Sequence, residues 1–226
     1  MIQQILHSCM SLVLPSPCSG CGYGGAEYPH MLCDSCRQKI LSGAPCDTLY
    51  SDIVSITWSC RMNKGALREC IKRFKYDGNR GFLPLFEKIL YPFIEDKSLA
   101  GPKPKLLVPV PIHPSKREFR GFNQSELLAE VVTSRSEHRL DRHLLVKTRN
   151  TPSQTGLTKQ KRINNLRGSF AVVDRLRVTG RSVILVDDIT TTGATLEACA
   201  RELLRAGARN VCALTLARTP LKSSHQ

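Results

Sequence analysis

The sequence predicts an α/β fold, a mostly parallel sheet with flanking helices, preceded by a small N-terminal cysteine-rich module. Val183 to Val186 form an apolar run typical of a strand buried on both faces of a parallel sheet. Apolar residues at helical spacing follow this run, and Gly207 stands where a helix would end. Two CxxC pairs mark the N-terminal module. We expect the module to cover residues 1–48 and the α/β domain to cover residues 49–226.

Two acids and a loop of small residues follow the central strand. Asp187 and Asp188 come directly after the apolar run, and a Thr/Gly-rich loop then opens the helix. The N-terminus of a helix binds phosphate through its unpaired N–H groups, and Gly193 lets the backbone approach the anion. Carboxylates accept hydrogen bonds from sugar hydroxyls instead. The motif therefore fits a ribose 5-phosphate, although a βα unit with acids that merely cap the helix is the alternative.

This run resembles the signature of type I phosphoribosyltransferases, which bind phosphoribosyl pyrophosphate (PRPP). The resemblance implies that Asp187 and Asp188 are the catalytic pair and bind the 2′- and 3′-hydroxyls of the ribose. It implies that the 5′-phosphate is bound by Thr191, Thr192, Gly193, Ala194 and Thr195. In purine-salvage enzymes the position of Thr191 is commonly an acid that serves as a base. Threonine does not do this near neutral pH, so purine salvage is not expected.

A second anion site is expected where the strand at 106–110 ends at alternating prolines. His113 and Arg120 lie in the turn that follows, together with Lys116 and Arg117. A strand, a sharp turn and several cations suit the pyrophosphate of PRPP. An exposed basic turn is the alternative.

Four cysteines have the spacing of a metal site. A CxxC places two thiolates on one tight turn, and two such turns complete a tetrahedral shell. The predicted ligands of a structural Zn²⁺ ion are Cys18, Cys21, Cys33 and Cys36. Disulfides, a redox pair and an iron–sulfur site are the alternatives, but disulfides are rare in the cytosol and no export signal is visible.

The charge of the chain points to a polyanion. The formal net charge is +14, more than a PRPP site requires, and nucleic acid is the commonest polyanionic partner. Aromatic residues next to a basic helix face at about 62–76 favour single-stranded nucleic acid, whereas an ordinary solvated face is the alternative. The candidate contacts are Lys72, Arg73, Lys75, Arg80 and Arg162. Arg162 lies in a long polar segment, 148–168, typical of a lid or a disordered loop.

The remaining elements follow from periodicity. Helices are expected near 1–14, 82–93 and 124–132, and strands near 53–59, 144–147 and 210–217. Residues 170–173 and 182–186 are expected to form a hairpin or neighbouring strands. The segment 1–14 lacks the features of a secretory signal. Its apolar residues have the spacing of a short amphipathic helix, which is interpreted as a packing element, with a membrane anchor as the alternative.

Six motifs in order make the chain similar to the ComF family of competence proteins. They are the two CxxC pairs, Phe74–Gly78, Val108–Pro111, Arg120–Gln124, the Gln154–Asn165 segment and Val186–Thr195. The resemblance implies a zinc knuckle fused to a type I phosphoribosyltransferase domain, in a cytoplasmic protein that handles single-stranded DNA during natural transformation. Other DNA-uptake proteins at the inner membrane are candidate partners. The alternative is an active phosphoribosyltransferase for an unidentified small acceptor, with Mg²⁺ bound to PRPP.

Overall fold

The computed structural model describes residues 17–26, 31–95, 105–151 and 165–220. The predicted helix at 1–14, most of the polar segment at 148–168 and the side chain of Arg162 lie outside these residues. Among the described residues, no helix is long and apolar enough to cross a bilayer.

The core of the fold is a parallel sheet of five strands in the order β1-β7-β6-β2-β3. The strands are β1 (Thr57–Met62), β2 (Leu106–Pro109), β3 (Arg139–Leu140), β6 (Ser182–Thr190) and β7 (Asn210–Arg218). The two long strands β6 and β7 lie at the centre, and alternate residues of β6 face the two sides of the sheet. Ile184 and Val186 belong to one apolar cluster, whereas Val183 and Leu185 belong to the other. The predicted sheet with flanking helices is confirmed.

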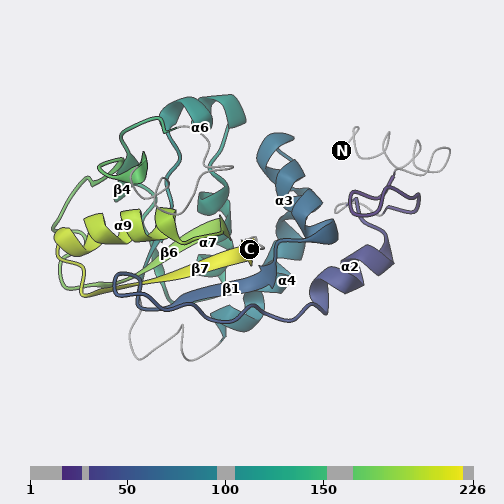
Figure 1. Ribbon diagram of the computed structural model, residues 1–226, viewed down its shortest axis with the longest axis horizontal. Helices are drawn as coiled ribbons and strands as arrows, with labels where there is room; N and C mark the ends of the chain where they lie inside the picture. Colours follow the sequence, from purple (N-terminus) through teal and green to yellow (C-terminus); the bar gives the residue numbers. More distant parts are fainter. Residues whose placement is uncertain (1–16, 27–30, 96–104, 152–164, 221–226) are drawn as a thin grey trace, which may run out of the picture.

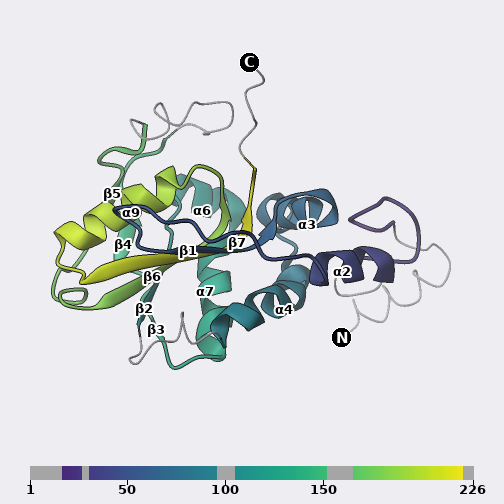
Figure 2. The same ribbon diagram turned by 60° about the horizontal axis from the view of Figure 1, so that its bottom comes forward.

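Helices cover both faces of the sheet (Figures 1 and 2). Helix α9 (Ala194–Arg205) lies on one face, and α4 (Leu83–Ile94) and α7 (Gln124–Ser134) lie on the other. A short helix, α6 (Pro114–Arg120), occupies the turn after β2, where the sequence predicted only an irregular basic turn. Proline at its first position and His113 at its N-cap explain why a helix forms there.

Two helices lie side by side at the end of the molecule beyond the sheet, α2 (Asp34–Leu41) and α3 (Gly65–Tyr76) (Figures 1 and 2). Helix α3 buries Leu67, Cys70, Ile71 and Phe74, as its periodicity predicts. The ring of Phe74 packs edge-on against that of Phe86 in α4, with 5.2 Å between their centroids. A single 3₁₀ turn, η1 (Arg80–Phe82), leads from α3 toward α4.

The second sheet differs from the sequence prediction. Strand β5 (Phe170–Val172) pairs antiparallel with β4 (Leu145–Lys147), and not with β6. The reason lies in the central position of β6, since both of its edges are already paired with β2 and β7. The prediction of a hairpin or of neighbouring strands for 170–173 and 182–186 is therefore wrong.

The N-terminal part of the domain also differs from the sequence prediction. Strand β1 begins at Thr57, four residues after the expected start at Ile53. Leu49 instead runs antiparallel to Thr57, and the N–H of Cys46 donates to the carbonyl of Ser59. The proposed boundary between residues 48 and 49 thus falls in a segment that pairs with β1, and it stays a prediction.

Candidate functional site: a carboxylate pair at the end of the central strand

The carboxylate pair lies near the carboxyl end of β6, where open α/β sheets bind their ligands. The Asp187 side chain accepts a 2.9 Å hydrogen bond from the hydroxyl of Ser125, in the first turn of α7. It also accepts a 2.9 Å bond from the backbone N–H of Asp188. Asp188 is buried, and its Oδ1 accepts a 2.8 Å bond from the N–H of Ile189. Both acids are therefore held in fixed positions.

A lysine from a distant part of the chain forms an ion pair with one of the two carboxylates. The ammonium of Lys75, near the end of α3, lies 2.7 Å from Oδ2 of Asp188. Burial opposes the charge of Lys75, but Asp188 and Asp187 outweigh burial and raise the pKa of this lysine. Burial and the neighbouring charge of Asp188 raise the pKa of Asp187 to about 7, even though Lys75 and Ser125 act in the opposite direction.

The loop after the carboxylates forms the N-terminus of α9. Gly193 is its N-cap, with a φ of 79° that only glycine adopts readily. A Cβ atom at this position would meet nothing within 4 Å, so the outer side of the loop is open. Thr191, Thr192 and Thr195 are half-buried, and Ala194 is buried in the first turn. This geometry offers backbone N–H groups and hydroxyls to an anion.

The predicted second anion site is only partly assembled. His113 caps α6 through its Nδ1 atom, which lies 2.8 Å from the hydroxyl of Ser115. Arg120 lies at the opposite end of α6, above the ring of Tyr76 and 3.2 Å from the Gln124 side chain. Burial and the charge of Arg120 lower the pKa of Lys116, while burial and the charge of Lys116 lower that of Lys147. These lysines form a cluster in which an anion would relieve the repulsion.

The four predicted cysteines come together. Their Sγ atoms all lie within 4.8 Å of one another, and those of Cys21 and Cys33 are 3.9 Å apart. A zinc ion with Zn–S bonds of about 2.3 Å requires sulfur atoms about 3.8 Å apart, so the donor set fits. Burial would raise the pKa of the Cys18 thiol, but backbone N–H groups of Cys33, Cys21 and Gly20 lower it to about 6. Cys46 is not in the cluster and lies 3.2 Å from the sulfur of Met62.

The residues predicted to contact nucleic acid differ from one another in exposure and in their contacts. Lys72 is exposed on α3, Arg73 is half-buried, and the guanidinium of Arg80 lies over the ring of Phe122. Lys75 belongs to the carboxylate site, as described above. Sequence reasoning assigned Lys75 to the basic helix face because a helical pattern does not show which lysine turns toward an acid elsewhere in the chain. Ser125 was not among the predicted site residues, and the signal that points to it is its place in the first turn of α7, two residues after the N-cap Asn123.

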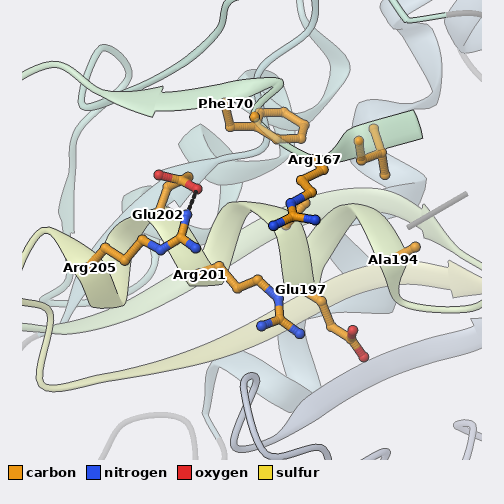
Figure 3. Close-up of a pocket in the computed structure, with 10 residues that line it drawn as sticks. Arg167, Phe170, Ala194, Glu197, Arg201, Glu202 and Arg205 are labelled. Atoms are coloured by element: carbon orange, nitrogen blue, oxygen red, sulfur yellow. Dashed lines mark hydrogen bonds and ion pairs between the residues drawn. The ribbon is translucent and has the colours of Figure 1, made fainter. Parts of the chain in front are cut away.

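A basic pocket of about 250 Å³ lies along the outer side of α9 (Figure 3). Its lining includes Arg167, Arg201 and Arg205, along with Glu197 and Glu202. Glu202 pairs with Arg205 at 2.7 Å, as the dashed line in Figure 3 marks. The pocket begins at Ala194, so it extends away from the predicted phosphate loop along the helix. Sequence reasoning did not identify it.

Comparison with known proteins shows which domain model and which proteins this chain resembles. Residues 126–225 match the phosphoribosyl transferase domain model, which includes the carboxylate pair and the loop. The DNA utilization protein YhgH of Escherichia coli O6:H1 is 37% identical over 116 residues, which are 51% of this chain and 50% of that protein. Competence protein ComFC of Bacillus subtilis is 35% identical over 155 residues, 68% of this chain and 60% of the relative. Competence protein F of Haemophilus influenzae is 28% identical over 66% of each chain.

The matches thus span about half the length of YhgH and 60% of ComFC. Among solved structures, a hypoxanthine phosphoribosyltransferase from Staphylococcus aureus aligns with a TM-score of 0.35 and 13% identity, over 63% of this chain and 75% of that one. The chain is therefore a homologue of ComFC, competence protein F and YhgH, with a phosphoribosyl transferase domain in its C-terminal part.

Proposed function

We propose that the protein is a DNA-uptake factor of natural transformation that binds PRPP or a related ribose 5-phosphate and contacts single-stranded DNA. The observation that carries the first part is the position of Asp187 and Asp188 near the carboxyl end of β6, with Ile189 and Thr190 between them and the open loop at the start of α9. The names of the homologues ComFC and competence protein F support the second part.

Each part of the ligand has a matching group. The two carboxylates accept hydrogen bonds from the 2′- and 3′-hydroxyls of the ribose, and the loop 191–195 binds the 5′-phosphate. Arg120, Lys116 and Lys147 are the cations available to a pyrophosphate, and the imidazole of His113 at the N-cap of α6 is a further polar group. Mg²⁺ that enters with PRPP neutralises part of the pyrophosphate charge. In this arrangement the acids also face the positive charge that develops at the anomeric carbon if the pyrophosphate departs.

Two basic surfaces of the protein are candidates for contact with single-stranded DNA. Lys72, Arg73 and Arg80 lie on or just after α3, the helix that ends at the exposed Tyr76. The arginines of the α9 pocket offer further contacts to phosphates (Figure 3). The predicted contact of Arg162 lies outside the described residues.

The cysteine cluster is proposed to bind one structural Zn²⁺ ion through Cys18, Cys21, Cys33 and Cys36. The site is closed, with four protein sulfurs and no open position, which suits a structural and not a catalytic metal. We place the protein in the cytoplasm, at the inner membrane when it meets other DNA-uptake proteins.

A second function, transfer of the phosphoribosyl group to a small acceptor, is favoured by one observation. A cavity of about 290 Å³ borders the loop, lined by Thr190–Gly193, Tyr50 and Arg218. Its size is near the lower limit of small-molecule sites, which suits a small acceptor.

Calorimetric titration with PRPP and Mg²⁺, with and without single-stranded DNA, tests the proposal. We expect binding in the wild type, a changed affinity when DNA is present, and no binding in the double variant Asp187→Asn, Asp188→Asn. Binding that is indifferent to DNA favours the transferase. Equal affinity of the double variant and the wild type would refute the site.

A further inference from the structure

The partner of Asp188 comes from outside the matched domain. Lys75 lies in α3, whereas the phosphoribosyl transferase match begins at residue 126. The pair is well shielded, because the side chain of Lys75 is 21% exposed and that of Asp188 only 7%. Removal of one member of a charge pair in such surroundings strongly destabilises the protein, because the other charge stays buried without a partner. The carboxylate site therefore depends on a residue that the N-terminal part of the chain supplies.

Lys75 affects the protonation of the two carboxylates. Two adjacent carboxylates repel each other, so one of them tends to remain protonated unless a cation compensates the charge. Lys75 supplies such a cation and lowers the pKa of Asp187, which burial and Asp188 raise to about 7. The groups that face Asp187 are Asp188 on its own strand, Lys75 from α3, Ser125 from α7, Lys147 from β4 and Cys199 from α9.

The other end of α3 packs on the cysteine module. A Cβ atom added to Gly20 would lie 2.6 Å from Cβ of Ala66 and 2.9 Å from Sγ of Cys36, closer than such atoms approach. Cys18 and Cys36 share one apolar cluster with Leu67, Cys70 and Ile71 of α3. Figures 1 and 2 both place α2 beside α3. The backbone of the cysteine module therefore touches the first turn of α3 directly.

The module is also fastened to the sheet. The guanidinium of Arg61 in β1 donates hydrogen bonds to the carbonyls of Ile40 and Leu41, at the end of α2. Helix α3 is continuous from Gly65 to Tyr76, a span of about 18 Å. Its first turn is thus set by the cysteine module, and its last turn carries Lys75 to Asp188.

We propose that Lys75 is a positioning residue of the carboxylate pair and that the four-cysteine module sets its place through helix α3. The inference rests on the proposed function, because its ligand is a ribose 5-phosphate. Metal bound by the four cysteines holds the module in one shape and keeps Lys75 on Asp188. Loss of the metal releases the first turn of α3 and weakens ligand binding at the far end.

The first experiment measures the Kd of ribose 5-phosphate by calorimetry in four proteins. We expect Lys75→Met to weaken binding roughly tenfold or more, and Lys75→Arg to restore part of the affinity. Lys88→Met, an exposed lysine of α4, serves as the matched control and should bind like the wild type. In Lys75→Met the pH at which binding reaches half its maximum should move upward, because Asp187 loses its counter-ion. Unchanged or tighter binding by Lys75→Met would overturn the inference.

The second experiment compares zinc-loaded protein with protein depleted by a chelator. Depletion should weaken ribose 5-phosphate binding in the wild type and cause no further loss in Lys75→Met. If circular dichroism shows that depletion unfolds the protein, the variant Gly20→Ala is used instead of depletion, provided that it retains one zinc per chain. Gly20→Ala should weaken ribose 5-phosphate binding when it is introduced into the wild type. It should cause no further loss when it is introduced into Lys75→Met. Equal affinity of loaded and depleted protein, or of Gly20→Ala and the wild type, would overturn the link to the module. A wild type that binds no ribose 5-phosphate at all would refute the proposed function instead.

Discussion

The hydroxyl of Ser125 donates a 2.9 Å hydrogen bond to Asp187, and this bond joins the first turn of α7 to the carboxyl end of β6. The same turn is fastened to the neighbouring strand, because the side-chain amide of Asn123 donates to the carbonyl of Val110. The N–H of Val110 in turn donates to the carbonyl of Val186. The start of α7 therefore fixes both the carboxylate and the turn that leads to α6.

The substitution Ser125→Ala tests this role. It removes one donor from Asp187 but leaves a small side chain in a buried position, so the fold should persist. We expect the affinity for ribose 5-phosphate to fall by about 1 kcal/mol, roughly fivefold, as measured by calorimetry. Ser134→Ala is the matched control, since Ser134 lies on the same helix but its hydroxyl donates to the carbonyl of Val131. A loss of equal size in both variants would contradict a specific role of Ser125.

The sequence predicts the strand, the acids and the loop at 183–195 because every signal there is local. The apolar run, the adjacent carboxylates and the glycine at the N-cap all act within one βα unit. The cysteine cluster is predictable for the same reason, since ligand spacing in the chain fixes which thiols share a turn. Local sequence signals therefore predict the acids, the loop and the four cysteines.

What the sequence does not reveal depends on contacts between distant segments. The pairing of Lys75 with Asp188 joins residues that no local pattern connects. Strand β3 has only two residues, Arg139 and Leu140, and becomes a strand because β2 offers an open edge beside it. The short helix α2 has no strong apolar face and is held by Arg61 through its last carbonyls. Tertiary contacts override propensity in each case.

The metal prediction can be tested with one ligand variant and one cysteine control. Cys33→Ser removes a ligand from the cluster, whereas Cys46→Ser changes a thiol outside it. We expect elemental analysis to find one zinc per chain in the wild type and in Cys46→Ser, and little in Cys33→Ser. The Tm of Cys33→Ser should fall by roughly 5–10 °C, the shift that 2–3 kcal/mol causes in a domain of this size. Zinc-free wild-type protein, purified in metal-replete medium, would refute the site.

The basic face of α3 predicts a salt-dependent affinity for single-stranded DNA. Replacement of Lys72, Arg73 and Arg80 by alanine removes three candidate phosphate contacts. The slope of log K against log salt concentration should become shallower by about 2, since each contact to a single strand contributes roughly 0.7. Fluorescence anisotropy with a labelled oligonucleotide measures this slope, and Lys88→Ala is the exposed control on α4. An unchanged slope in the triple variant would place the DNA elsewhere, with the arginines of the α9 pocket as the next candidates.

The raised pKa of Asp187 makes a prediction about stability. Its pKa is about 7 in the folded protein and near 3.8 when the chain is unfolded. Between these values the folded state binds the extra proton, so the free energy of unfolding falls as pH rises from about 4 to 7, by at most about 1.4 kcal/mol per pH unit. Above pH 7 this contribution is constant. Lys75, whose raised pKa lies well above this window, keeps its charge throughout.

The variant Asp187→Asn isolates this contribution, because asparagine has the shape of the protonated acid and does not titrate. Urea unfolding of both proteins at several pH values gives the difference in free energy of unfolding. We expect the variant to gain stability relative to the wild type as pH rises from 5 to 7. Titration of the cysteine cluster affects both proteins alike and cancels in the difference. A difference that does not change with pH would show that Asp187 is ionised throughout, with Lys75 and Ser125 sufficient to keep it charged.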